Sequence, residues 1–167
     1  MPNKSVAEIH LNSTKNTLDA ETRKAVIELL NARLAEAIDL ELQAKQAHWN
    51  VKGPNFIGLH ELFDKVSAAA AEYKDEIAER AVMLGGVAVG TAQAVVERTT
   101  LQPYPLEAQD WKSHVDCVSS ALAKFGTALR QAIEDADELE DQVTTDLLTG
   151  IAHGVDKYLW FVESHRG

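Results

Sequence analysis

Residues 48–79 read HWNVKGPNFIGLHELFDKVSAAAAEYKDEIAE and carry two histidines and a series of carboxylates at helical spacing. His60 and Asp64 are four residues apart, as are Asp75 and Glu79, so each pair lies on one face of a helix. From Asp64 to Asp75 is roughly three turns, so all four side chains point the same way, with the pairs about 16 Å apart along the axis. One metal ion cannot contact both pairs on a straight helix. Either the pairs are unrelated, or a second copy of the helix brings the distant pair alongside.

The same stretch predicts a helix from Asn55 to Leu84, which Gly85-Gly86 ends. Its core-facing row takes steps of three and four, as helix packing requires, and consists of Leu59, Phe63, Val66, Ala70, Tyr73, Ile77 and Leu84. The row of candidate ligands, with Ala68 and Ala71 at its middle, lies about 100° round the helix. The ligands are therefore expected to flank the bundle core rather than to fill it.

Outward from this stretch, the apolar periodicity predicts three more long helices. Asp19 caps a first helix that ends near Asn50, a third helix carries the apolar row from Trp111 to Ile133, and a fourth carries the apolar row from Leu148 to Val162. The crossover before the third helix spans about 20 residues, long for a bundle loop, and within it residues 91–98 predict a short helix. EDADELED, residues 134–141, is interpreted as an acidic connection. These features predict an all-α, ferritin-like four-helix bundle.

Length and composition favour one globular domain, residues 19–167, preceded by a flexible N-terminal arm, residues 1–18. Hydrophobic residues make up 46% of the chain, and no apolar run approaches the 18 or so residues of a membrane span. The N-terminus lacks the apolar core of a secretory signal. The single cysteine, Cys117, fits a reducing compartment. We therefore expect a cytoplasmic protein with no membrane partner, and nucleoid association stays open.

The formal net charge of −10 predicts an acidic surface, which concentrates cations and repels phosphate backbones. The arm offers Lys4 and Lys15 with Glu8 between them, so it holds no strong basic block. Acidic residues near the third connection are candidates for a cation entry pore, although for any one of them a solvated loop is the simpler interpretation: Asp135, Asp137, Glu138, Glu140, Asp141 and Asp146.

Imidazole and carboxylate together suit first-row metals such as iron, manganese, zinc and cobalt. HELFD has an aspartate where the HExxH motif needs its second histidine, which excludes a zinc protease. Taken singly, each candidate is more often a solvated or packed residue. A two-fold axis through Ala68–Ala71 between antiparallel helices, however, would bring His60 and Asp64 of one chain to Asp75 and Glu79 of the other. Such a dimer makes two sites, to which His48 can add a nitrogen.

Three segments resemble the Dps family, the DNA-protection-during-starvation mini-ferritins: KQAHWNVKGPNFIGLHELFDKV, DEIAERAVMLGGVAVGT and VDKYLWFVESH. The resemblance covers residues from about 20 to the C-terminus. It implies a homododecamer built from two-fold dimers, which oxidises Fe(II), preferably with hydrogen peroxide, and stores ferric mineral inside. The ligands implied for two iron ions at each inter-subunit site are His48, His60 and Asp64 of one subunit with Asp75 and Glu79 of its partner. Trp49 matches the family's tryptophan beside this site.

The arm departs from the lysine-rich tails of DNA-condensing members, because Lys4 and Lys15 alone predict weak, salt-sensitive DNA binding. Several arms on one dodecamer could add avidity. The main hypothesis is thus a peroxide-using ferroxidase that stores iron and protects DNA from oxidative damage. The alternatives are a DNA-binding, nucleoid-compacting protein with secondary iron chemistry, and a metal-free bundle that serves as an assembly module.

Overall fold

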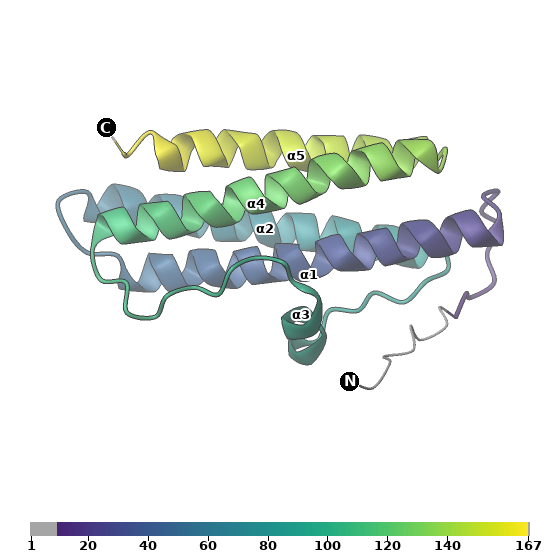
Figure 1. Cartoon of the computed structure of the whole chain (residues 1–167), viewed down its shortest axis with the longest axis horizontal. Helices are drawn as coiled ribbons and strands as arrows, with labels where there is room; N and C mark the ends of the chain where they lie inside the picture. Colours follow the sequence, from purple (N-terminus) through teal and green to yellow (C-terminus); the bar gives the residue numbers. More distant parts are fainter. Residues whose placement is uncertain (1–9, 167) are drawn as a thin grey trace.

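Residues 10–166 are described by the computed structural model, and within them all regular structure is helical (Figure 1). The elements are α1 (Ala20–Asn50), α2 (Phe56–Met83), α3 (Ala92–Arg98), α4 (Trp111–Glu138) and α5 (Gln142–Glu163). The four long helices and the short helix of the crossover confirm the predicted all-α bundle. None of the helices in residues 10–166 has the length and hydropathy to span a membrane.

Capping side chains fix where the helices begin. The carboxylate of Asp19 accepts the backbone N–H groups of Glu21 and Thr22 at 2.9 and 3.0 Å, which satisfies two of the free donors at the start of α1. Thr91 caps α3 and Asp110 caps α4 in the same way. The predicted starts of α1 and α3 are therefore confirmed to within one residue, and α4 begins at the first residue of its predicted apolar row.

The bundle is two helical hairpins packed on one another. α1 lies beside α2, α4 lies beside α5, and the crossover runs along the outside of the bundle with α3 against α1 (Figure 1). The core-facing row predicted for α2 is buried, except that Tyr73 is half-buried. The row of candidate ligands, about 100° round α2, consequently flanks this chain's own core, with Asp64, Asp75 and Glu79 exposed and His60 partly exposed.

Buried polar side chains hold the crossover against α1. Asn31, only 3% exposed, donates to the carbonyl of Val87 and accepts from the N–H of Val89. The fully buried carboxylate of Glu36 accepts a hydrogen bond from the hydroxyl of Thr100 at 2.6 Å. Because burying these groups without partners would be costly, they fix the path of the crossover along the bundle.

The acidic connection predicted for residues 134–141 is wrong in its length, because α4 continues through Glu138. The fully buried Ala136 extends the apolar row, and the chain turns only at Glu140, which has a φ of 57°. Asp141 caps α5 and is 2% exposed. A role for Asp141 in an entry pore is therefore excluded, whereas such a role for the exposed Glu138 and Asp146 stays a prediction.

The described part of the arm, residues 10–18, contains no helix but contacts the bundle. The backbone N–H of Asn12 donates to the carbonyl of Gly85 at 2.7 Å, and Leu11 and Leu18 pack on the core. Lys15 is exposed, while Lys4 and Glu8 lie outside the described residues. The division at residue 18 stays a prediction.

Candidate metal centre

His48 and His60 meet where α1 ends and α2 begins. His48 lies in the last turn of α1 and His60 in the second turn of α2, and their ring centroids are 3.8 Å apart. Nδ1 of His48 lies 2.7 Å from the carbonyl oxygen of His60, and Nδ1 of His60 lies 2.8 Å from the carbonyl oxygen of His48. The two residues thus form a reciprocal pair, which we call the histidine latch.

The latch sets the proton position on both rings. A carbonyl oxygen only accepts hydrogen bonds, so Nδ1 of each ring must carry the hydrogen. In the neutral imidazole this leaves a lone pair on Nε2, which is the form that binds a metal ion. Backbone carbonyls often hold ligand histidines in this way. In its neutral form, each ring would therefore have Nε2 free to bind a metal ion.

The stacking of the rings limits what they can bind together. Their planes differ by 21°, with centroids 3.8 Å apart. The Nε2 lone pair lies in the ring plane, and a first-row metal binds imidazole at about 2.0–2.1 Å. Two nearly parallel rings at this separation cannot both direct their lone pairs at one ion. This geometry favours a separate ion on each histidine over one shared ion.

Asp64 lies one turn along α2 from His60, and its side chain is about half exposed. Lys45 of α1 forms an ion pair with it. The hydrogen bond from Lys45 is the largest influence on the pKa of Asp64 and holds it below its usual value, although desolvation acts in the opposite direction. The charge of Lys45 and the nearby His48 and His60 add to the lowering. Asp64 is therefore ionised and already paired with the ammonium group of Lys45.

The second pair of carboxylates stands apart from the histidine latch. Asp75 and Glu79 are exposed on α2, and so is Ala68 between the pairs, while Ala71 is partly exposed. This confirms that the row of candidate ligands faces outward. In residues 10–166 no three His, Cys, Asp or Glu side chains are placed to hold one ion. The chain alone brings His48 and His60 together and places Asp64 nearby, but it does not bring Asp75 and Glu79 to them.

Two neighbours of the latch were missed by the sequence analysis. Phe56, at the start of α2, lies 5.1 Å from the ring of His60, centroid to centroid. Lys45 is three residues before His48, a spacing that places both on one side of α1 and was the available signal. Trp49, which the sequence analysis had singled out, is 66% exposed beside the latch.

Comparisons with known proteins agree with this architecture. The ferritin-like domain family matches residues 27–167. The DNA protection during starvation protein of Agrobacterium fabrum is 43% identical over 154 residues, which are 92% of this chain and 95% of that protein.

Solved structures are similar over nearly the whole chain. DpsA14 from Streptomyces coelicolor has a TM-score of 0.89 at 33% identity and covers 95% of this chain and 94% of its own. Dps from Microbacterium arborescens in the high iron form has a TM-score of 0.83 at 33% identity, covering 93% and 98%. With a matching family, a relative above 40% identity and the same fold throughout, the chain belongs to the Dps family of ferritin-like proteins.

Proposed function

We propose that this protein is a ferroxidase and iron store that oxidises Fe(II) with hydrogen peroxide at sites shared by two subunits. The ferric product would be stored as mineral inside a hollow homododecamer, which protects DNA from oxidative damage. The names of the relatives support the protective role, and the high iron form of M. arborescens Dps supports iron as the cargo.

One observation carries the proposal: the candidate ligands form an outward row on α2 whose two halves cannot meet within one chain. The latch, with Asp64, offers two nitrogens and one carboxylate, and Asp75 and Glu79 offer two more carboxylates about 16 Å away. Ala68 and Ala71 lie between them and are small enough for a second α2 to approach closely. An antiparallel partner helix would complete two equivalent sites.

At such a site, two Fe(II) ions, one hydrogen peroxide and two protons would give two Fe(III) ions and two water molecules. When two Fe(II) ions are bound, each gives one electron to the same peroxide molecule. The peroxide is then reduced directly to water, and no hydroxyl radical is released. Carboxylates favour the harder Fe(III) product, while the latched imidazoles hold Fe(II). Trp49, exposed beside the latch, would intercept one-electron oxidants that escape the pair.

Subunit mixing tests the shared site. One variant carries His60→Ala and Asp64→Ala, and the other carries Asp75→Ala and Glu79→Ala; each alone should oxidise Fe(II) with peroxide no faster than a protein-free control. After dissociation and reassembly of a 1:1 mixture, half of the dimers are mixed, and each of these regains one intact site. About a quarter of the wild-type activity should then return.

The reassembled mixture is compared with each variant reassembled alone, and oligomer size is checked by light scattering. No recovery in a correctly assembled mixture would show that the two pairs do not share a site. Wild-type rates in either variant alone would exclude these ligands. Failure of the wild-type protein to take up iron at all would favour the metal-free assembly module.

Direct DNA binding is the second candidate, favoured by the names of the curated relatives. Within residues 10–18 one lysine, the exposed Lys15, is available for phosphate contacts. We expect weak binding that disappears as salt rises. Gel shifts at low and physiological salt, with and without residues 1–18, test it, and the absence of any shift would remove this candidate.

A further inference from the structure

A tyrosine and a histidine outside the set of candidate ligands form a hydrogen-bonded pair between the crossover and α4. The hydroxyl of Tyr104 lies 2.5 Å from Nδ1 of His114, and the ring planes differ by 22°, with centroids 6.0 Å apart. His114 is 1% exposed, and Tyr104 is partly buried. Because a shielded phenol and imidazole can exchange a proton without water, this tyrosine–histidine pair is suited to redox chemistry.

The phenol of the pair donates and the imidazole accepts. Burial lowers the pKa of His114, so the ring is neutral at neutral pH and one of its nitrogens is an acceptor. Nδ1 of His114 is the one hydrogen-bond partner of the Tyr104 hydroxyl within residues 10–166. Nε2 makes no hydrogen bond there, but the backbone of Asn50 raises the pKa of the ring. A group with that effect is an acceptor, which suits a hydrogen on Nε2 and leaves Nδ1 to accept from the phenol.

The pair lies beside the end of α1 that carries the histidine latch. Asn50, whose backbone acts on His114, is the last residue of α1 and directly follows Trp49. Trp111, the first residue of α4, packs against the turn after α1, where a Cβ at Gly53 would lie 2.8 Å from its ring. Tryptophan, tyrosine and histidine side chains therefore gather around one end of α1, next to the candidate metal centre.

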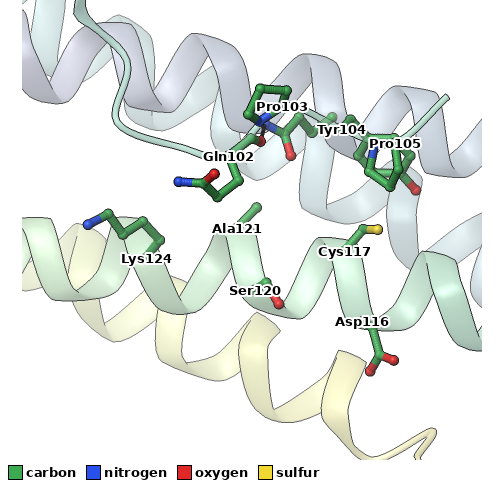
Figure 2. A pocket seen from close by; sticks show the side chains of 10 residues that line it. Gln102, Pro103, Tyr104, Pro105, Asp116, Cys117, Ser120, Ala121 and Lys124 are labelled. Carbon is green, nitrogen blue, oxygen red and sulfur yellow. Dashed lines mark hydrogen bonds between the residues drawn. The ribbon is translucent and has the colours of Figure 1, made fainter.

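The only cysteine of the chain lies on the other side of the tyrosine. Tyr104 and Cys117 line one groove, and Figure 2 shows Cys117 projecting from α4 toward the crossover. Burial raises the pKa of Tyr104, and the neighbouring Cys117 adds to this. Burial, followed by the charges of Asp116 and Glu107, raises the pKa of Cys117. Peroxide attacks the thiolate, so this protonated thiol resists peroxide but can still give one electron and its proton to a tyrosyl radical.

We propose that Tyr104 and His114 carry one-electron oxidation from the metal centre to Cys117. The proposal rests on the ferroxidase function proposed above, which supplies the oxidant. A site that holds a single Fe(II) gives peroxide one electron, and the products are Fe(III), hydroxide and a hydroxyl radical. This radical takes an electron from Trp49 and becomes hydroxide.

Each later step moves one electron and one proton. The phenol of Tyr104 returns an electron to oxidised Trp49 and passes its proton to Nδ1 of His114. The tyrosyl radical then takes an electron from Cys117 and recovers its proton from His114, while the thiol releases its own proton to water in the groove. In sum, one hydroxyl radical and one thiol give water and one thiyl radical, at a fixed position away from the iron.

A photochemical oxidant tests the pair without iron. In the iron-free assembled protein, a laser flash generates ruthenium(III) tris(bipyridine), and a nitrone spin trap marks Cys117 for peptide mass spectrometry. Tyr104→Phe should reduce the Cys117 adduct to the level of an unflashed sample, whereas Tyr158→Phe, a partly buried control on α5, should leave it unchanged. Trp49→Phe should also lower the adduct.

Rapid-freeze electron paramagnetic resonance tests the role of His114 as a base. The wild-type protein should show a tyrosyl radical that is absent from Tyr104→Phe and forms more slowly in heavy water. His114→Gln keeps a hydrogen-bond acceptor but removes the base, so the radical should form about tenfold more slowly. An unchanged rate in His114→Gln would overturn proton transfer to the histidine, because hydrogen bonding alone would then be sufficient.

The iron reaction is the second arm. With one Fe(II) per site and peroxide, Cys117 should again be trapped in wild type and not in Tyr104→Phe. An equal Cys117 adduct in wild type and Tyr104→Phe after the flash would overturn the proposal, since oxidation would reach the thiol by another route. Trapping through Tyr104 after the flash, but none with iron and peroxide, would support the pair as an electron carrier and contradict the proposed iron chemistry as its source.

Discussion

His48 and His60 hold each other in place through main-chain acceptors: each Nδ1 donates to the carbonyl oxygen of the other residue. Because both acceptors belong to the backbone, removing one histidine side chain leaves the hydrogen bond of the other intact. The latch therefore orients each ring separately, while the stacking at 3.8 Å keeps the rings from sharing an ion.

Replacing either histidine of the latch should remove one of the two metal ions and leave the other bound. His48→Ala and His60→Ala should each lower the number of Co(II) ions bound at a site from about two to about one, because each ring directs one lone pair at its own ion. Titration of the assembled protein with Co(II), followed by metal analysis after gel filtration, measures this. His153→Ala, an exposed histidine on α5, is the control. Loss of both ions from either variant would contradict separate sites.

Lys45 should compete with metal ions for Asp64, because it occupies that carboxylate in the metal-free chain. Lys45→Met keeps the length of the side chain and removes its charge. The pKa of Asp64 should then rise toward its usual value, since its largest lowering influence is the hydrogen bond from Lys45. At neutral pH the carboxylate is still ionised, so Co(II) should bind up to about fivefold more tightly.

The comparison is repeated in high salt, where screening should reduce the difference between Lys45→Met and wild type. Lys24→Met, which disrupts an exposed ion pair in the first turns of α1, is the matched control and should leave affinity unchanged. Weaker Co(II) binding in Lys45→Met would mean that Lys45 positions the carboxylate rather than competing for it.

Arg80 and Asp141 form a buried ion pair between the end of α2 and the start of α5. Arg80 donates to both carboxylate oxygens at 2.9 and 3.0 Å, and the two side chains are 9% and 2% exposed. Arg80→Met should destabilise the protein by about 3–5 kcal/mol, because it leaves the buried carboxylate of Asp141 without a positively charged partner. Arg80→Met with Asp141→Ser, which keeps a capping side chain, should recover much of this loss. Denaturation at one fixed protein concentration compares them.

The ion pair between Arg80 and Asp141 also predicts that the stability of the protein depends on pH in the acidic range. Burial opposes the shift, but hydrogen bonds from Thr144 and Arg80 outweigh it and hold the pKa of Asp141 below its usual 3.8. The unfolded chain therefore binds this proton at a higher pH than the folded one. The stabilisation is complete above about pH 3.8 and is lost as pH falls through the lower folded pKa. Melting temperatures from pH 6 to 2 should fall more steeply for wild type than for the double variant. Parallel curves would exclude this contribution.

Helical spacing was sufficient to predict α2 and its two faces, because a row with steps of three and four defines a buried side and an outer side on any regular helix. The starts of α1 at Asp19 and of α3 at Thr91 could be predicted for a similar reason, because a capping side chain is a local signal. The end of α4 could not be predicted in this way. Residues 134–141 are mostly acidic and were interpreted as a loop, but Ala136 among them is buried, and the helix continues to Glu138.

The side-chain contacts between helices could not be predicted from the sequence. The latch and the ion pair between Lys45 and Asp64 both join α1 to α2, so they depend on how far one helix is shifted along the other. The turn at residues 51–55 sets that shift, and periodicity does not report it. The burial of Asp141 likewise needs Arg80 from a helix 61 residues earlier in the chain.

A bulky residue between the ligand pairs should prevent the close approach of two α2 helices. Ala68 is exposed, so Ala68→Leu can fold without crowding its own core, but across a two-fold axis the added side chains would meet each other. We expect a smaller oligomer and Fe(II) oxidation lowered at least tenfold, measured by analytical ultracentrifugation and absorbance. The control is Ala123→Leu, an exposed position on α4. A wild-type oligomer with full activity in Ala68→Leu would place the partner subunit elsewhere, and the shared site could not be built on this face of α2.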